Sequence, residues 1–312
     1  MCKLFIIGNG FDLASGLKTS YKDFREYMCS TYKPTDEFSD GMPKSKSSGI
    51  ITAYDEGEMG RFLYHLINNS CKKENWSDFE ESLSDLDFKY ALENWENSQI
   101  EDYYIKNGDI PPINEWDETR NLREFRRNFS HVIDYLNDCF SDWVKSIDIT
   151  KGNKIDKFSD IIVLKASKFL NFNYTMTLEN LYNIPSKNIC HIHVWNKNYI
   201  FGHGVLENKT ITYNNDYKNI NIARIFQQIT ESLRKNTNRW LEQNKTFFVG
   251  LNNITDIYSY GFSFSDVDLP YIEKICAVVN SSNVTWHQYS YNESDYTDIL
   301  RDCGFKGEIK FW

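Results

Sequence analysis

A short apolar run that stops at a pair of glycines constrains the fold of this chain more than any other feature. Leu4-Phe5-Ile6-Ile7 precedes Gly8-Asn9-Gly10, and the residues that follow suit a helix. An uninterrupted apolar run of this length is typical of a parallel strand that helices cover on both faces. Glycines after such a strand let backbone N–H groups approach a phosphate, although a plain turn would use the same glycines.

The second half of the chain alternates between strand and helix patterns. This alternation predicts an α/β fold with a mostly parallel, Rossmann-like sheet flanked by helices. We predict strands at 169–172, 189–193, 199–201, 254–260 and 284–289, and helices at 222–244 and 266–279.

The part of the chain between these two regions has a different pattern. Residues 33–57 are rich in turn-forming and charged residues and predict an exposed loop. Apolar residues at helical spacing predict helices within 58–95 and one long helix over 117–147. We therefore predict a single α/β domain over residues 1–312 with a loop-rich and helical insertion at 30–150.

Composition excludes several classes of partner. The 44 acidic and 35 basic residues give a net charge of -9, which disfavours binding to nucleic acid. No apolar stretch approaches the roughly 20 residues of a membrane helix, so no membrane partner is expected. The seven cysteines lack paired spacing, and this indicates neither a disulfide framework nor a cysteine zinc site. We expect a soluble cytoplasmic protein.

Three further segments place polar residues where predicted strands end. They are Asn171-Phe172-Asn173-Tyr174-Thr175, His191-Ile192-His193 and Gly261-Phe262-Ser263. Polar groups at strand carboxyl ends lie at the edge where α/β proteins bind ligands. The first segment would equally suit a helix capped by Thr175 or Thr177.

Two side-chain types in these segments leave alternatives open. His191 and His193, together with His203, could bind zinc, or a single histidine could act as a general base. The Asp12 carboxylate would repel a phosphate, so we expect it to cap the following helix or to contact a hydroxyl.

Taken together in this order, the motifs resemble the AbiH family of bacterial phage abortive-infection proteins over nearly the whole chain. The resemblance is carried by short motifs along the sequence. These are Gly8-Asn9-Gly10-Phe11-Asp12-Leu13, Gly16-Leu17-Lys18-Thr19-Ser20-Tyr21, Trp76-Ser77-Asp78-Phe79-Glu80, Phe172-Asn173-Tyr174-Thr175, His191-Ile192-His193 and Tyr260-Gly261-Phe262-Ser263.

The same segments are more distantly similar to the SIR2, or sirtuin-like, fold of NAD-consuming enzymes. That resemblance implies NAD as substrate or ligand and its nicotinamide–ribose bond as the bond that is broken. It implies that Asn173 orients the ribose or the attacking water and that His193 acts as a base, with no metal expected. The predicted cofactor-binding residues are Gly8, Asn9, Gly10, Phe11, Asp12, Ser20, Tyr174, Gly261 and Ser263.

The leading hypothesis is an abortive-infection effector that hydrolyses NAD or a related nucleotide, that is, an NAD glycohydrolase. Val194 and Thr175 depart from the sirtuin pattern, so a nucleotide-binding sensor without turnover stays open, as does a metal-dependent hydrolase that uses the three histidines. A phage-derived activator is compatible with the family. Assembly into a homo-oligomer also stays open, although no helix pattern defines its interface.

Overall fold

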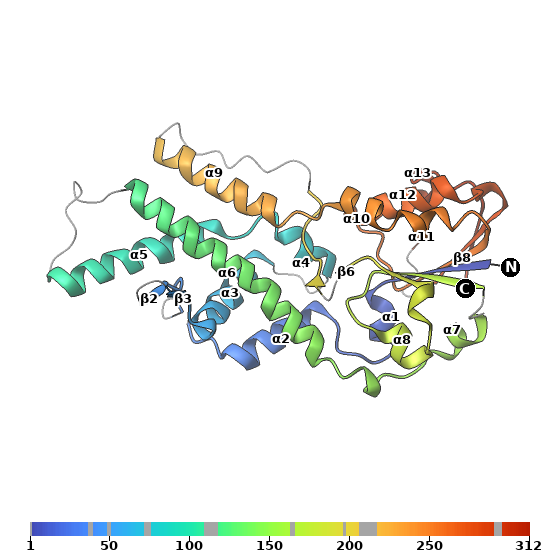
Figure 1. Cartoon of the computed structure of the whole chain (residues 1–312), viewed down its shortest axis with the longest axis horizontal. Helices are drawn as coiled ribbons and strands as arrows, with labels where there is room; N and C mark the ends of the chain where they lie inside the picture. The colour runs from blue at the N-terminus through green and yellow to red at the C-terminus, as the bar shows by residue number, and fades with distance from the viewer. Residues whose placement is uncertain are drawn as a thin grey trace. The chain divides into compact units, whose positions relative to one another are not determined.

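The computed structural model describes residues 2–36, 40–48, 51–71, 76–108, 118–162, 166–195, 198–205, 217–289 and 295–312. The chain forms two compact units (Figure 1). The first, which we call the sheet unit, comprises Met1–Ser20, Val144–Gly204 and Lys235–Trp312. The second, the helical unit, comprises Tyr21–Trp143 and Val205–Arg234. That the chain is one domain with an insertion at 30–150 stays a prediction.

The sheet unit is built on a six-stranded sheet in which every neighbouring pair is parallel. The strand order is β10-β9-β8-β1-β4-β5. The strands are β1 (Cys2–Ile7), β4 (Ser167–Asn171), β5 (Ile189–His191), β8 (Ile254–Tyr260), β9 (Thr285–Gln288) and β10 (Glu308–Phe311). By place along the chain this order is 6-5-4-1-2-3, the doubly wound order in which the direction of winding reverses between the first and fourth strands. The predicted Rossmann-like α/β fold is confirmed, and its switch point lies between β1 and β8.

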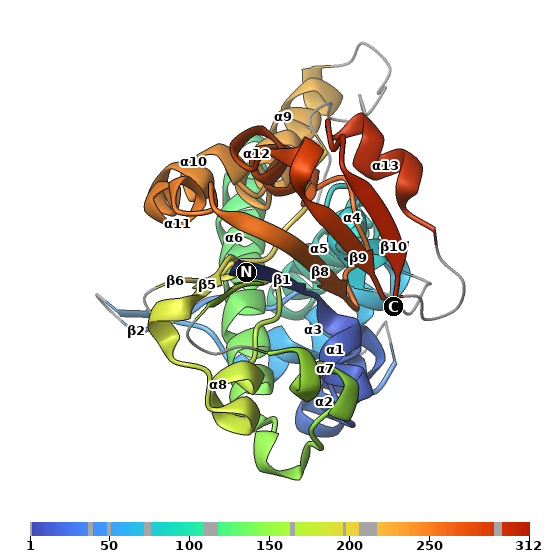
Figure 2. The ribbon, with the colours of Figure 1, turned by 90° about the vertical axis from the view of Figure 1, so that its right-hand side faces the viewer.

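Alternate residues of β1 belong to the two faces of the sheet. Leu4 and Ile6 pack in one hydrophobic cluster, and Phe5 and Ile7 in the other, because successive side chains of a strand point to opposite faces. Figure 2 shows the helices that cover each face. One face carries α10 (Thr237–Gln243), α11 (Lys245–Val249), α12 (Leu269–Val278) and α13 (Thr297–Asp302), and the other carries α1 (Asn9–Ala14), α7 (Asp156–Ile161) and α8 (Thr177–Tyr182).

Three details of the sheet unit differ from the sequence-based prediction. The predicted strand at 199–201 is a short hairpin outside the main sheet, with β6 (Val194–Trp195) antiparallel to β7 (Asn198–Tyr199). The predicted helix at 222–244 is interrupted, because the Asn236 side chain accepts a hydrogen bond from the Arg239 N–H and starts α10 anew. The edge strand β10 was not predicted, since its residues are largely exposed and carry no apolar run.

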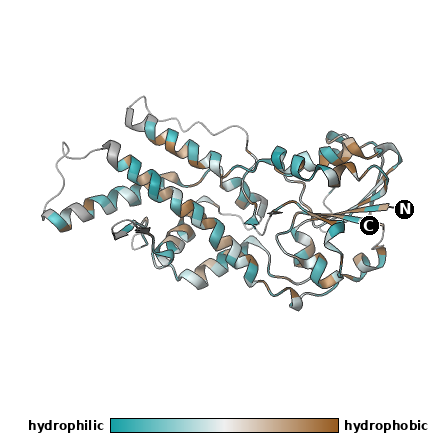
Figure 3. Ribbon diagram, viewed as in Figure 1, coloured by the Kyte–Doolittle hydropathy of each residue, from teal (hydrophilic) through white to brown (hydrophobic). Residues whose placement is uncertain are grey.

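The helical unit contains the long helix that the apolar spacing predicts. This is α6 (Glu118–Ser146), along which hydrophobic and hydrophilic residues alternate (Figure 3). Its other helices are α2 (Tyr21–Tyr32), α3 (Glu56–Ser70), α4 (Trp76–Ser82), α5 (Phe88–Asn107) and α9 (Tyr217–Ser232). The prediction of a loop throughout 33–57 is wrong in part, because β2 (Lys46–Ser48) and β3 (Ile51–Ala53) form a hairpin there.

Candidate functional site

The glycine loop after β1 packs backbone to backbone against the loop after β8. The Gly8 N–H donates to the Tyr260 carbonyl and the Gly10 N–H to the Gly261 carbonyl, each at 3.0 Å. A Cβ on Gly8 would lie 2.4 Å from the Gly261 oxygen, and one on Gly261 would lie 2.3 Å from the Phe11 nitrogen. Gly261 also has a φ of +60°, which favours glycine. The glycines are therefore required by the contact of two loops at the switch point.

This contact bears on the predicted phosphate loop. The amides of Gly8 and Gly10 already have protein partners, and the Phe11 N–H donates to the Gly8 carbonyl at 2.9 Å. The Phe11 side chain is fully buried in the core, where its ring meets those of Phe158, Tyr182 and Tyr260. A phosphate near this loop would need other donors than these three amides.

The other predicted binding residues lie at the same carboxyl edge of the sheet, except Ser20, which lies between α1 and α2. Asn9 is half-buried at the start of α1, and Ser263 is exposed after β8. Ser20 is half-buried and is the last residue of the sheet unit. Tyr174 is half-buried and stacks on the ring of His193, with 5.3 Å between ring centroids. Their role in binding stays a prediction.

Asp12 lies fully buried in α1, with its carboxylate turned towards the segment that follows β4. It accepts a hydrogen bond from the Thr175 hydroxyl, which lies 2.9 Å from the hydroxyl of Thr177. Of the two roles predicted for Asp12, the contact with a hydroxyl is found and the helix cap is not, and the prediction that Thr175 or Thr177 caps a helix is wrong. The N-cap residues of α1 and α8 are Gly8 and Met176, neither of which has a side chain suited to a cap, and the nearby polar side chains bond to one another.

The environment of Asp12 makes its carboxylate unusually basic. Burial raises the pKa of Asp12 to about 6, although hydrogen bonds from Thr175, Thr177 and Asn173 act in the opposite direction. Loss of hydration therefore outweighs three hydrogen bonds. A carboxylate whose pKa is near neutral can give and take a proton under cellular conditions, which is typical of functional sites.

A second network fixes the end of β4 next to Asn173. The Asn171 side chain accepts from the Asn173 N–H at 3.1 Å and lies 3.2 Å from His191 Nδ1. His191 Nε2 lies 2.8 Å from Glu179 Oε1. Donation by the Asn171 amide to Nδ1 leaves the proton of a neutral imidazole on Nε2, from which it is donated to Glu179. His191 therefore joins β4, β5 and α8 and has a structural role.

His193 belongs to a third polar group. Its Nε2 lies 3.2 Å from Lys235 Nζ and 3.4 Å from Asp268 Oδ1, and all three residues are buried. Although burial acts to raise the pKa of Asp268, the charge of Lys235 and contacts with His193 and Ser265 outweigh it and hold that pKa below its ordinary value. We call these three residues the His193 triad.

Sequence reasoning missed two members of the His193 triad. Asp268 lies seven residues beyond Gly261 in the segment that the glycine and serine residues had singled out, so a carboxylate count there could have found it. Lys235 lies between α9 and α10, in the interior of what the sequence predicts as one continuous helix. Nothing in its sequence neighbourhood distinguishes it from a solvated lysine.

The three histidines do not form a metal site. His191 and His193 have separate partners, and His203 contacts the Lys235 N–H through its carbonyl oxygen. Among the residues that the structure describes, no three His, Cys, Asp or Glu side chains are placed to hold a metal ion. The metal-dependent hydrolase therefore has no support in the positions of these side chains.

Among the buried side-chain atoms that lack a hydrogen-bond partner within the described part of the chain, three belong to residues that the sequence predicts for the site. They are Asp12 Oδ1 after β1, Asn173 Oδ1 after β4 and His193 Nδ1 after β5. Buried polar atoms are nearly always paired, because an unpaired one costs roughly 1–3 kcal/mol. Because these three atoms lie on the segments that follow three neighbouring strands, this edge is the candidate ligand site.

A comparison with protein families accounts for the motifs at this edge. The family model described as bacteriophage abortive infection AbiH matches residues 4–290. The chain belongs to the AbiH family. No curated protein and no solved structure matches it. The resemblance to AbiH proteins is thereby confirmed, and the similarity to SIR2 proteins stays a prediction.

One AbiH motif outside the sheet unit has a packing role. Trp76 and Phe79 of α4 contact Tyr21 of α2, whose ring stacks on Phe79 at 4.7 Å. Trp76 also packs against Phe140 and Trp143 of α6. These aromatic residues build the core of the helical unit.

As the composition predicts, no helix within the described ranges is long and apolar enough to cross a membrane.

Proposed function

We propose that this AbiH protein is an abortive-infection effector that binds NAD or a related nucleotide at the carboxyl edge of its sheet and hydrolyses the nicotinamide–ribose bond. The observation that carries the proposal is the set of three unpartnered buried atoms on Asp12, Asn173 and His193. They follow β1, β4 and β5, on one side of the switch point where doubly wound sheets bind nucleotides.

The chemistry of the first two atoms suits a sugar. The unpartnered oxygens of Asp12 and Asn173 are acceptors, whereas a phosphate presents acceptors of its own. The hydroxyl groups of a ribose are donors, so a ribose would satisfy both oxygens. We therefore assign Asp12, which the glycine loop alone could not explain, to the ribose and not to the pyrophosphate.

These residues also suit the proposed reaction. Breaking the nicotinamide–ribose bond develops positive charge on the ribose, which an ionised Asp12 beside it would stabilise. Asn173, whose amide contacts Asp12, would hold the ribose or the attacking water in position. His193 would meet the ligand through Nδ1, because its other nitrogen faces Lys235 and Asp268.

Nicotinamide release by the purified protein tests the proposal. We expect release from NAD, with phage lysate added if an activator is needed, and a loss of about 100-fold or more in Asn173→Ala and His193→Ala. No release from the wild type with or without lysate would contradict NAD hydrolysis.

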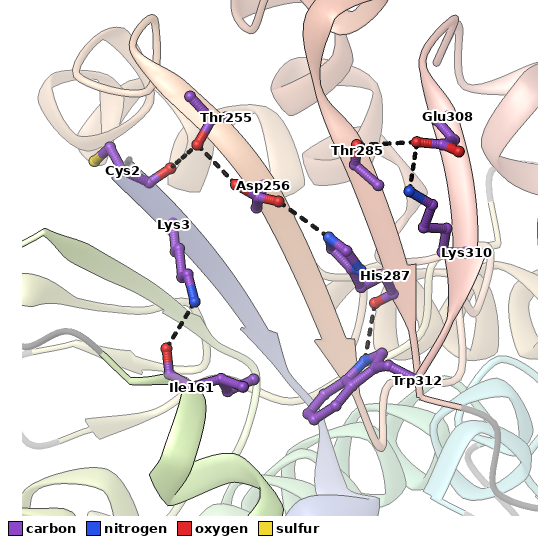
Figure 4. A network of polar contacts seen from close by, with 10 residues as sticks. All are labelled: Cys2, Lys3, Ile161, Thr255, Asp256, Thr285, His287, Glu308, Lys310 and Trp312. Carbon is purple, nitrogen blue, oxygen red and sulfur yellow. Dashed lines mark hydrogen bonds and ion pairs between the residues drawn. The ribbon is translucent and has the colours of Figure 1, made fainter.

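Two matched substitutions control for the loss of an amide or an imidazole as such. Asn253→Ala changes an exposed asparagine before β8. His287→Ala changes a histidine that pairs with Asp256 on β8 and accepts from the Trp312 indole through its carbonyl (Figure 4). Both should keep wild-type activity.

A sensor that binds the nucleotide without turnover is the second candidate. Thr175 favours it, because this residue departs from the sirtuin pattern and its hydroxyl bonds to Asp12. Calorimetric titration with NAD and with ADP-ribose separates the two candidates. Binding of both with no nicotinamide release in any condition would establish the sensor.

A further inference from the structure

His193 meets its two charged neighbours with one ring nitrogen and leaves the other without a partner. Lys235 Nζ and Asp268 Oδ1 both face Nε2, at 3.2 and 3.4 Å. Nδ1 is buried and has no hydrogen-bond partner among the described residues. The tautomer of the ring therefore depends on which of the two neighbours bonds to Nε2, and it decides whether Nδ1 accepts or donates.

The two neighbours demand opposite tautomers. An ammonium group has donors only, so a hydrogen bond from Lys235 requires the lone pair of Nε2 and places the proton of a neutral ring on Nδ1. A carboxylate has acceptors only, so a hydrogen bond to Asp268 requires the proton on Nε2 and leaves Nδ1 as a base.

The contacts favour Lys235. Lys235 Nζ makes a hydrogen bond with Nε2, whereas Asp268 Oδ1, although close enough for electrostatic attraction, lacks a hydrogen-bond partner. Asp268 is instead held by the Ser265 hydroxyl, which donates to its other oxygen at 3.3 Å. The carboxylate thus balances the charge of Lys235, and Lys235 determines the proton position on His193.

Two aromatic rings fix the imidazole in this orientation. Tyr174 stacks on it, with centroids 5.3 Å apart and 27° between the planes. Phe172 meets it edge to face at 5.6 Å. These contacts fix the plane of the ring, and a flip within that plane would put Cε1 in the place of Nε2 and lose the hydrogen bond with Lys235. Nδ1 is therefore the atom that His193 can offer to a ligand.

We propose that Lys235 and Asp268 are positioning residues that hold His193 as the neutral Nδ1–H tautomer, so that His193 is a hydrogen-bond donor to the ligand and not a general base. The ligand atom that it meets is then an acceptor, such as a carbonyl or ribose oxygen. The tautomer follows from the contacts alone, whereas the role towards the ligand rests on the proposed function.

The tautomer can be read in the ligand-free protein by two-bond ¹H–¹⁵N correlation spectra of protein labelled at its six histidines. The signals that disappear in His193→Asn identify His193. We expect the Nδ1–H tautomer in the wild type and in Lys235→Arg, which keeps a cationic donor. We expect a change to Nε2–H, paired with Asp268, in Lys235→Met.

Each outcome bears on the inference. A neutral His193 with its proton on Nε2 in the wild type would overturn it, and this spectrum needs no variant to fold. A tautomer that Lys235→Met leaves unchanged would overturn the role of Lys235. The His287 and His191 signals serve as controls, because their carboxylate partners, Asp256 and Glu179, are intact in every variant.

Activity measurements then test the role towards the ligand. In His193→Asn an amide N–H can replace Nδ1–H but cannot act as a base, and in His193→Leu neither is possible. A donor role predicts that Asn keeps at least tenfold more nicotinamide release than Leu, whereas equal losses of 100-fold or more would indicate a base. If the wild type releases no nicotinamide, NAD hydrolysis fails while the spectra still decide the tautomer.

Discussion

Asp12 and Asp268 are both buried carboxylates at the carboxyl edge of one sheet, yet their pKa values move in opposite directions. Burial raises that of Asp12 to about 6 against the hydrogen bonds of two threonines and an asparagine. Burial acts on Asp268 in the same way, but the charge of Lys235 and further contacts reverse the outcome. The comparison teaches that neutral hydrogen-bond donors reduce the cost of a buried charge, whereas a buried countercharge can cancel it.

The largest effect is expected when the countercharge of Asp268 is removed. Lys235→Met leaves a buried carboxylate without its cation and should reduce the free energy of unfolding by about 3–5 kcal/mol in urea denaturation at pH 7.5. Lys245→Met, at an exposed lysine paired with Glu242, is the matched control and should change little.

A double substitution then tests whether charge is the cause. Lys235→Met combined with Asp268→Leu removes both charges and should recover most of the lost stability, because a buried pair can be replaced by apolar residues at little cost. If the double variant is as unstable as Lys235→Met, packing and not charge explains the loss.

Asp12→Asn should raise the free energy of unfolding, whereas Lys235→Met lowers it. The folded protein binds the Asp12 proton more tightly than the unfolded chain, with a pKa of about 6 against the ordinary 3.8. Stability contributed by this group is therefore present below about pH 4 and is lost as the pH rises through 6. At about 1.4 kcal/mol per pH unit, ionisation costs about 3 kcal/mol. Asn at this position avoids that cost at pH 7.5.

The measurement is urea unfolding of wild type and Asp12→Asn at pH 4 and pH 7.5. We expect a gain of up to about 3 kcal/mol at the higher pH, a much smaller difference at the lower one, and a loss of nucleotide binding. A variant that is less stable than wild type at pH 7.5 would show that the ionised carboxylate stabilises the fold after all.

The loop contact beside Asp12 should be sensitive to a single methyl group. The Cβ that Gly261→Ala adds would lie 2.3 Å from the Phe11 nitrogen, and the φ of +60° at this position is unfavourable for alanine. We therefore expect the free energy of unfolding to fall by about 2–3 kcal/mol. Gly304 has a φ of +90° but nothing within 4 Å of an added Cβ. Gly304→Ala should therefore cost about 1 kcal/mol, and equal losses at both sites would mean that the loops can separate without penalty.

The smallest effect is expected at the pair of His191 and Glu179. Their side chains are 14% and 13% exposed. Glu179→Gln removes the negative charge but keeps an oxygen that can accept the hydrogen bond from His191 Nε2. We expect a loss of about 1 kcal/mol in thermal or urea unfolding and no change in the tautomer of His193. A change at His193 would show that the two networks are coupled through Asn171 and Asn173.

The sequence predicts the sheet better than it predicts the polar groups at its edge. The apolar run of β1 and the alternation around β8 and β9 define buried strands, because burial on both faces imposes apolar residues. The edge strand β10 is largely exposed, so its residues need not be apolar. The break between α9 and α10 depends on the cap at Asn236. The helical spacing of apolar residues continues past Asn236 in the sequence and hides this break.

The sequence predicts where the candidate site residues lie in the sheet but not how their side chains are oriented. The ends of β1, β4 and β5 place Asp12, Asn173 and His193 at one edge, as expected of parallel strands. The orientation of Asp12 could not be predicted, because it depends on Thr175 across 163 positions of sequence. Lys235 could not be predicted either, since a lysine is ordinarily solvated and only the fold brings this one to Asp268.

The central position of β1 has a consequence for biosynthesis. Its neighbours in the sheet are β4, which begins at Ser167, and β8, which begins only at Ile254. During translation β1 can therefore pair with β4 only after Asn171 has been made and with β8 only after Tyr260 has been made, while the intervening helices can already fold. Such a late-closing apolar segment is a natural target for chaperones, and it makes the sheet unit slow to form and sensitive to premature termination.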